Sequence, residues 1–207
     1  MLAAALTGIP PNGTPPDPLA SAIEHYRTVE SYRVTIHSTH AGGEEYIRYF
    51  YKKPGLVRME FIRPHAGAVL VYNPATQSVH LWPFGVKHFP DLSLSPGNPL
   101  IRSSRGQRVD RSDVGALFEN IRALKEGGNS VVSGEESLNG HTVVHLVVTG
   151  SGNFAVAGVH RHELWLDTES QFPVKGISRD QQDNIIETVM MEELEINITL
   201  PETLFNP

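Results

Sequence analysis

About ten short segments rich in Val, Ile, Tyr and Phe dominate the sequence, and clusters of turn-forming residues separate them. They form two groups of about five, and a segment with a helical period precedes each group. Short links of this kind favour sequential antiparallel strands, and ten such strands are too many for a flat sheet. We therefore predict an α+β fold, a curled antiparallel sheet of about ten strands that forms a half-barrel, with two or more helices covering its concave face.

Turn-forming pairs keep the links between the expected strands short. Pro54-Gly55 and Asn73-Pro74 lie in the first group, and Asn139-Gly140, a strong hairpin signal, lies in the second. The order of helices and strands along the chain leaves two arrangements open. One is two duplicated halves, and the other is one long meander with an inserted helix. The expected strands are residues 32–39, 45–53, 56–63, 68–72, 78–82, 130–138, 141–149, 159–167, 173–180 and 185–196.

The two helical segments carry apolar residues on one face and recognisable signals at their ends. Asp17 is a good N-cap for a helix over residues 18–30. A second helix is expected to begin after a cap at Asp110 or Ser112 and to end at Gly127-Gly128. Both helices are amphipathic, so each is expected to pack one face against the sheet.

Length and composition fit one domain preceded by an irregular leader. The chain has 207 residues, of which 40% are hydrophobic and 19% are charged, and this suffices for a sizeable core. Residues 1–16 are rich in Pro and Gly and predict a flexible leader, followed by a single half-barrel domain over residues 17–207. Within that domain, residues 83–104 contain several prolines and no regular period, so we expect a long loop of the kind that often carries function.

Composition also excludes several classes of function. The formal net charge is -6 and no stretch concentrates basic residues, which argues against a nucleic-acid partner. The absence of Cys excludes a thiol nucleophile, a thiolate metal site and a disulfide scaffold. Pro and Gly interrupt the long uncharged stretch of residues 64–86, so we do not expect the chain to span a membrane. Residues 1–6 are too short for the apolar part of a signal peptide, which is expected to be absent from this chain.

No enzyme motif stands out in the sequence. The Gly-x-Ser-x-Gly elbow of serine hydrolases and a complete phosphate-binding glycine loop are both missing, so we expect neither catalysis nor a cofactor. Four histidines on two neighbouring strands leave a metal site as an alternative, which requires His145 to lie opposite His162. The simpler interpretation makes them polar residues on a solvated face of the sheet. The four histidines are His141, His145, His160 and His162.

Five segments, taken in their order along the chain, resemble the outer-membrane lipoprotein carrier superfamily, the LolA-like and LolB-like proteins. Each segment is short, and together they span most of residues 18–206. The second of them is similar to the hairpin of that family in which a basic residue and Pro precede a tight turn. The segments are VESYRVTI from Val29, YKKPGLVRME from Tyr51, AVLVYNP from Ala68, LWLD from Leu164 with FPV from Phe172, and LEIN from Leu194 with Phe205.

The resemblance implies a half-barrel whose apolar interior holds acyl chains of lipoproteins or lipids in the periplasm, without catalysis. It also implies envelope proteins as donor and acceptor partners. In the carriers, an Arg before the hairpin Pro governs the opening of the lid, whereas this chain has Lys53, which lacks the planar hydrogen bonding of Arg. Lys53 and Arg58 are therefore the candidate polar gate residues.

Apolar side chains of the first helix, the second helix and two strands are expected to line the cavity. Moving an acyl chain from water into such a cavity gains about 0.8 kcal/mol per CH₂ group. The alternative hypothesis is an envelope sensing or protein-interaction module that uses the same fold and stores no lipid. The expected lining residues are Ile23, Tyr26, Val57, Met59, Phe61, Val69, Val71, Leu117, Phe118 and Ile121.

Overall fold

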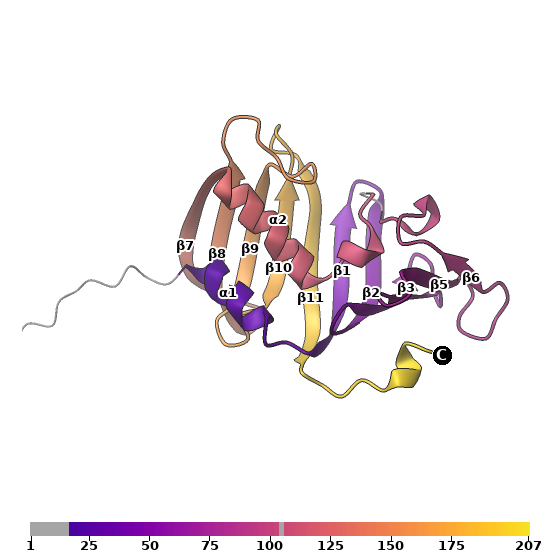
Figure 1. Ribbon diagram of the computed structural model, residues 1–207. Helices are drawn as coiled ribbons and strands as arrows, with labels where there is room; N and C mark the ends of the chain where they lie inside the picture. Colours follow the sequence, from indigo (N-terminus) through magenta and orange to yellow (C-terminus); the bar gives the residue numbers. More distant parts are fainter. Residues whose placement is uncertain (1–16, 104–105) are drawn as a thin grey trace, which may run out of the picture.

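The computed structural model describes residues 17–103 and 106–207, and its strands form one antiparallel sheet (Figure 1). The expected leader, residues 1–16, lies outside the described residues. Ten of the strands coincide with the ten predicted ones to within two residues at either end. The strands are β1 (Ser31–His40), β2 (Gly43–Lys52), β3 (Leu56–Arg63), β4 (Val69–Asn73), β5 (Ser78–Trp82), β6 (Leu92–Leu94), β7 (Gly128–Leu138), β8 (His141–Gly150), β9 (Arg161–Asp167), β10 (Pro173–Arg179) and β11 (Ile185–Ile196).

The sheet consists of two meanders that meet in its middle. Its strand order is β6-β5-β4-β3-β2-β1-β11-β10-β9-β8-β7, so β1 pairs with β11 and the two edges are β6 and β7. The arrangement is therefore two meanders joined by a long-range strand pair, and the sheet does not close into a barrel. The predicted α+β fold, a curled antiparallel half-barrel with helices on one face, is confirmed.

Helix α1 (Pro18–Tyr26) begins where the sequence predicts and ends four residues early. The Asp17 side chain accepts a hydrogen bond from the Leu19 N–H, and Pro18 occupies the first turn. The predicted extension to residue 30 is wrong, because the chain leaves the helix after Tyr26 and buries Val29, which is 1% exposed, beside the start of β1. Val is also β-branched and a weak helix former.

Helix α2 (Val114–Glu126) crosses the concave face of the sheet (Figure 1). The chain must travel from β6 at one edge to β7 at the other, and α2 lies on this path. The predicted caps Asp110 and Ser112 are wrong, since the Asp113 carboxylate accepts the hydrogen bond from Ala116 N–H. Asp110 belongs instead to a short 3-10 helix, η2 (Val109–Arg111). Gly127 ends α2 as predicted.

The predicted loop over residues 83–104 contains two short elements. Strand β6 pairs with β5, and the 3-10 helix η1 (Pro99–Ile101) follows it. Both have three residues, which is too short for a pattern of apolar residues to reveal. Strand β6 therefore extends the sheet by one strand beyond the ten predicted.

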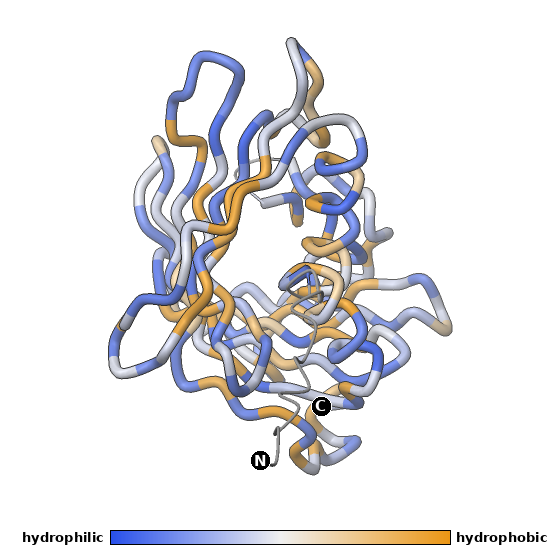
Figure 2. Tube along the Cα trace, turned by 90° about the vertical axis from the view of Figure 1, so that its left-hand side faces the viewer, coloured by the Kyte–Doolittle hydropathy of each residue, from blue (hydrophilic) through white to orange (hydrophobic). Residues whose placement is uncertain are grey.

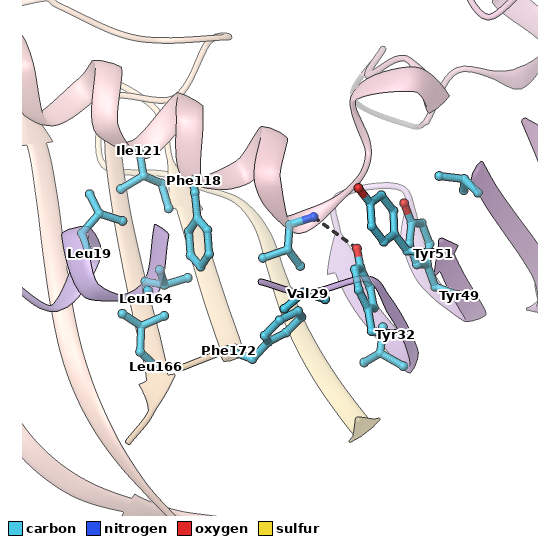
Figure 3. Close-up of a cluster of buried hydrophobic side chains, with 14 of the residues drawn as sticks. Leu19, Val29, Tyr32, Tyr49, Tyr51, Phe118, Ile121, Leu164, Leu166 and Phe172 are labelled. Carbon is cyan, nitrogen blue, oxygen red and sulfur yellow. Dashed lines mark hydrogen bonds between the residues drawn. The ribbon is translucent and has the colours of Figure 1, made fainter. Parts of the chain in front are cut away.

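The main core lies between the sheet and the two helices. Seen from the side in Figure 2, the helices cover one face of the curved sheet, and hydrophobic stretches of both alternate with hydrophilic ones. Figure 3 shows Leu19, Phe118 and Ile121 of the helices above Leu164 and Leu166 of β9. None of the helices in residues 17–103 and 106–207 is long and apolar enough to span a membrane.

A second apolar cluster covers part of the convex face of the sheet. It joins outward side chains of β2, β4 and β5 to the end of the chain, which includes the 3-10 helix η3 (Glu202–Leu204). Leu200 and Phe205 are 8% and 5% exposed, so the tail packs as a strap along the sheet. The cluster consists of Phe50, Val69, Val71, Trp82, Leu200 and Phe205.

Candidate functional site: an apolar cavity under the second helix

Aromatic rings fill one part of the space between the sheet and α2. Tyr32 stacks on Tyr49 with ring centroids 5.9 Å apart and on Tyr51 at 5.0 Å (Figure 3). Phe172 meets the Tyr32 ring edge-on at 5.2 Å, and Tyr26 meets the Phe118 ring edge-on at 5.9 Å. These contacts join α1, α2, β1 and β2, and such aromatic pairs stabilise a fold beyond the area that they bury.

The hydroxyl groups of this aromatic cluster hold the start of α2. The Tyr26 hydroxyl donates to Asp113 Oδ1 over 3.1 Å, and the Tyr49 hydroxyl lies 3.1 Å from Ser112 Oγ. The Tyr32 hydroxyl accepts from the Val114 N–H at 3.3 Å, as the dashed line in Figure 3 marks. Three tyrosines thereby fix the N-terminus of the helix that covers the concave face.

Burial raises the pKa of each tyrosine in the cluster above its ordinary value. For Tyr26 and Tyr32, desolvation is the main cause, and the nearby Asp113 carboxylate and neighbouring tyrosine hydroxyls add to it. Desolvation also raises the pKa values of Tyr49 and Tyr51, although hydrogen bonds with Ser112 and Tyr26 oppose it. The tyrosines therefore act as neutral donors and acceptors at neutral pH.

Beside the aromatic cluster lies a cavity of about 480 Å³. Its size falls within the range of about 300–1,000 Å³ that is usual for sites of small molecules. Its walls come from both meanders, and α2 with the segment before it forms its cover. The apolar lining residues are Ile36, Ile47, Met59, Phe61, Ala68, Leu70, Leu81, Pro83, Leu92, Leu100, Ile101, Val109, Val114, Leu117, Val156, Ala157, Val159, Leu164, Pro173, Val189 and Met191.

The cavity reaches one end of the sheet, which we call the loop end. It is the end that carries residues 41–42, 64–68, 83–91, 151–160 and 180–184, as the strand pairing shows. Six lining residues come from these connections, and two of them, His65 and Ala157, are exposed. The other four are Ala68, Pro83, Val156 and Val159. No lining residue among the described ones comes from the connections at the opposite end, so the cavity meets solvent at the loop end.

Polar side chains gather in the cavity near the loop end. Ser38 Oγ donates to Glu187 Oε1 over 3.0 Å, and Ser178 Oγ lies 3.3 Å from His162 Nδ1. Glu45 lines the same region. The cavity therefore has an apolar interior and a polar opening, which matches the two ends of an amphiphile.

The structure distributes the ten expected lining residues over three places. Met59, Phe61 and Leu117 line the cavity. Val69 and Val71 do not, because they point to the convex face and pack in its apolar cluster. The strand register explains this, since Met59 of β3 pairs with Leu70 of β4 and paired residues share a face. The other five lie in or against the core next to the cavity, and they are Ile23, Tyr26, Val57, Phe118 and Ile121.

The two candidate gate residues lie apart from the cavity and from each other. Lys53 Nζ donates to the Arg27 carbonyl oxygen and to Glu30 Oε1, both at 2.9 Å, so it contacts the segment that leaves α1. Arg58 is 8% exposed and points to the convex face, opposite the cavity. Its Nε donates to Glu60 at 2.9 Å and its Nη1 to the Leu204 carbonyl oxygen at 2.8 Å, so it fastens the C-terminal strap.

The four histidines do not converge on a metal site. His145 pairs with Trp165 in the sheet and His162 with Val148, so the opposition that the metal alternative requires is absent. His145 stacks on Trp165 on the convex face with centroids 4.2 Å apart, whereas His162 lines the cavity. His141 Nδ1 lies 2.9 Å from Asp167 Oδ2, and His160 Nδ1 lies 2.8 Å from the Phe154 carbonyl oxygen. The described residues contain no group of three or more potential metal ligands.

Sequence reasoning missed most of the cavity wall for three different reasons. Leu70 and Leu81 alternate with convex-face residues, and the register from Met59 could have assigned them to the cavity. Val189 and Met191 lie on β11, whose pairing with β1 has no local signal in the sequence. Ile101 lies in a proline-rich segment without any period.

Comparisons with known proteins show a shared fold. No family model and no curated protein matches the sequence. An uncharacterized conserved protein from Thermus thermophilus is 13% identical, with a TM-score of 0.57 over 91% of either chain. MucB in the MucA/MucB complex of Pseudomonas aeruginosa is 15% identical, with a TM-score of 0.54 over 89% of this chain and 60% of that chain.

The Mycobacterium tuberculosis lipoprotein LppX has a TM-score of 0.54 at 9% identity, over 89% of this chain and 95% of that chain. At such identities the likeness shows the fold alone. The open antiparallel sheet also agrees with the half-barrel that the resemblance of the sequence segments implies.

Proposed function

We propose that the protein is a non-enzymatic binding protein that shields acyl chains of a lipoprotein or lipid in the cavity under α2. The observation that carries the proposal is the cavity of about 480 Å³, whose wall is mainly aliphatic and whose opening is polar. Transfer of an acyl chain into such a wall gains about 0.8 kcal/mol per CH₂ group. The polar groups at the loop end would keep the head group of the amphiphile in contact with water.

Movement of the cover would widen the route that a ligand takes from the loop end, because α2 and the segment before it lie over the cavity. The start of α2 is held by a few hydroxyl hydrogen bonds, each worth about 1 kcal/mol net. Binding of an acyl chain would favour any state in which the cover stands slightly away from the sheet. Lys53, which ties the end of α1 to the β2–β3 turn, remains the candidate gate residue of the two.

The periplasm as location, and envelope proteins as donor and acceptor, follow from the resemblance of the sequence segments and belong to the same proposal. The alternative of a sensing or protein-interaction module has its own support. The likeness of fold includes MucB, whose structure was solved in a complex with MucA. In that case the cavity would stay empty and a protein would bind the outer surface.

Native mass spectrometry of the purified protein, with organic extraction and lipid analysis, tests the proposal. We expect a bound species that carries acyl chains. Met59→Asp places a charge in the cavity wall and should lose this species, whereas Ile62→Asp, on the same strand but 41% exposed, should keep it. Circular dichroism checks that both variants fold. Protein that carries no lipid and takes up none from added vesicles would refute acyl-chain binding and leave the interaction module.

A further inference from the structure

The connection between β5 and β6, residues 83–91, exposes apolar side chains that the core does not use. Phe89 is 92% exposed and Phe84 is 69% exposed, the two largest values among the exposed large hydrophobic side chains of the described residues. In Figure 1 this connection extends beyond the sheet next to the labels of β5 and β6. Two phenylalanines so exposed on one loop mark a surface that contacts something apolar.

This loop lies at the opening of the cavity. Pro83, which precedes Phe84, lines the cavity, as does Leu100, which is 65% exposed itself. The backbone of Gly85 packs against the turn before β4, where the Gly67 carbonyl oxygen lies 3.4 Å from the position of a Cβ on residue 85. His65 of that turn also lines the cavity. Phe84 and Phe89 therefore stand beside the cavity's route to solvent.

The charges near the two phenylalanines have the opposite sign to the protein as a whole. The chain has a net charge of -6, yet residues 62–91 contain Arg63, Lys87 and a single carboxylate, Asp91. Asp91 pairs with His80, with 3.3 Å between Oδ1 and Nδ1. Within the described part of the chain, Lys87 forms no ion pair. A basic residue between two exposed phenylalanines complements a surface that is apolar inside and anionic outside.

We propose that residues 83–91 dock the protein on anionic lipid bilayers by inserting Phe84 and Phe89 below the head groups. Lys87 would lie at the level of the lipid phosphates, where a basic residue gains about 1 kcal/mol from the surface potential. The purpose of docking rests on the proposed function, because it would let acyl chains enter the cavity without crossing water. The docking itself is a separate property and is measured separately.

The test is sedimentation of the protein with vesicles of phosphatidylcholine and phosphatidylglycerol, compared with vesicles of phosphatidylcholine alone. We expect binding to the mixed vesicles that weakens with added salt. The double variant Phe84→Ser/Phe89→Ser should lower the partition coefficient about tenfold or more, because each ring loses its transfer into the lipid. Lys87→Gln should reduce binding to mixed vesicles alone.

The matched control is Val131→Ser/Val132→Ser. These valines are also exposed large hydrophobic residues, at 57% and 48%, but they lie on edge strand β7 at the far side of the sheet. Wild-type protein that stays in solution with both kinds of vesicle would overturn docking, and so would an equal loss in the control. If the protein binds the mixed vesicles but does not bind a soluble fatty-acid probe, docking is supported and the proposed function of the cavity fails.

Discussion

At the scale of single residues, the neutral tyrosines under α2 make the fold sensitive to alkali. The pKa values of Tyr26, Tyr32, Tyr49 and Tyr51 are raised in the folded protein, whereas a tyrosine in the unfolded chain ionises near pH 10. Above about pH 10 the unfolded state therefore loses protons that the folded state keeps. The stabilisation is fully present below that pH and is lost as the pH rises through the folded values.

We predict that the free energy of unfolding, measured with urea, changes little up to about pH 9 and falls steeply above about pH 10, the midpoint of the unfolded tyrosines. Tyr49→Phe should be less stable at pH 8, by about 1 kcal/mol, and should decline less with pH. Tyr46→Phe is the control, since Tyr46 stacks on His37 outside the cluster. An identical alkaline decline in both variants would contradict the role assigned to the buried hydroxyl groups.

A second prediction at this scale concerns Arg58. Because its guanidinium is buried on the convex face and fastens the strap at Leu204, Arg58→Met should lower the free energy of unfolding by about 2 kcal/mol. It should leave the affinity for a fatty-acid probe unchanged. Lys53→Met, which breaks an exposed ion pair with Glu30, should lower the free energy of unfolding by less than about 1 kcal/mol. Weaker probe binding by folded Arg58→Met would restore Arg58 as a gate residue.

At the scale of the elements, the sequence predicts the positions of the strands well because turn signals delimit them. It predicts poorly which face of the sheet each side chain points to. Residues 69–72 of β4 are all buried, since one face of the strand meets the cavity side and the other meets the C-terminal strap. A strand buried on both faces has no alternation, so hydropathy alone could not distinguish Val69 and Val71 from Leu70. The pairing of Leu70 with Met59 distinguishes them. The β1–β11 pair was also beyond prediction, because residues more than 140 positions apart meet there.

The start of α2 gives a prediction for a whole element. Asp113 caps the helix and also accepts from the Tyr26 hydroxyl, so Asp113→Ala should lower the free energy of unfolding by about 1–2 kcal/mol. Glu119→Ala on the exposed face of α2 removes only a solvent-exposed ion pair with Arg111. It should lower the free energy of unfolding by less than about 0.5 kcal/mol. Thermal unfolding compares the two, and equal midpoints would show that the cap does not anchor α2.

At the scale of the whole molecule, the open sheet and its cover explain why an interior space exists. The chain crosses from edge β6 to edge β7 over the concave face, and a single helix cannot fill the trough of eleven strands. Aromatic rings fill the part near α1, whereas the part near the loop end remains a cavity. The sequence predicts the half-barrel and the existence of this cavity, because ten sequential strands must curl. It does not predict the wall from residues 92–109, which lack a periodic pattern.

The central claim is that the cavity under α2 binds an acyl chain, and titration of a fluorescent fatty acid tests it most directly. We expect saturable binding at one site, weakened about tenfold or more by Phe61→Asp and by the space-filling Val189→Phe, and unchanged by Ile62→Asp. Val189→Phe keeps the test valid if Phe61→Asp unfolds. Binding of equal strength to wild type and folded cavity variants, or no binding by wild type, would contradict the account.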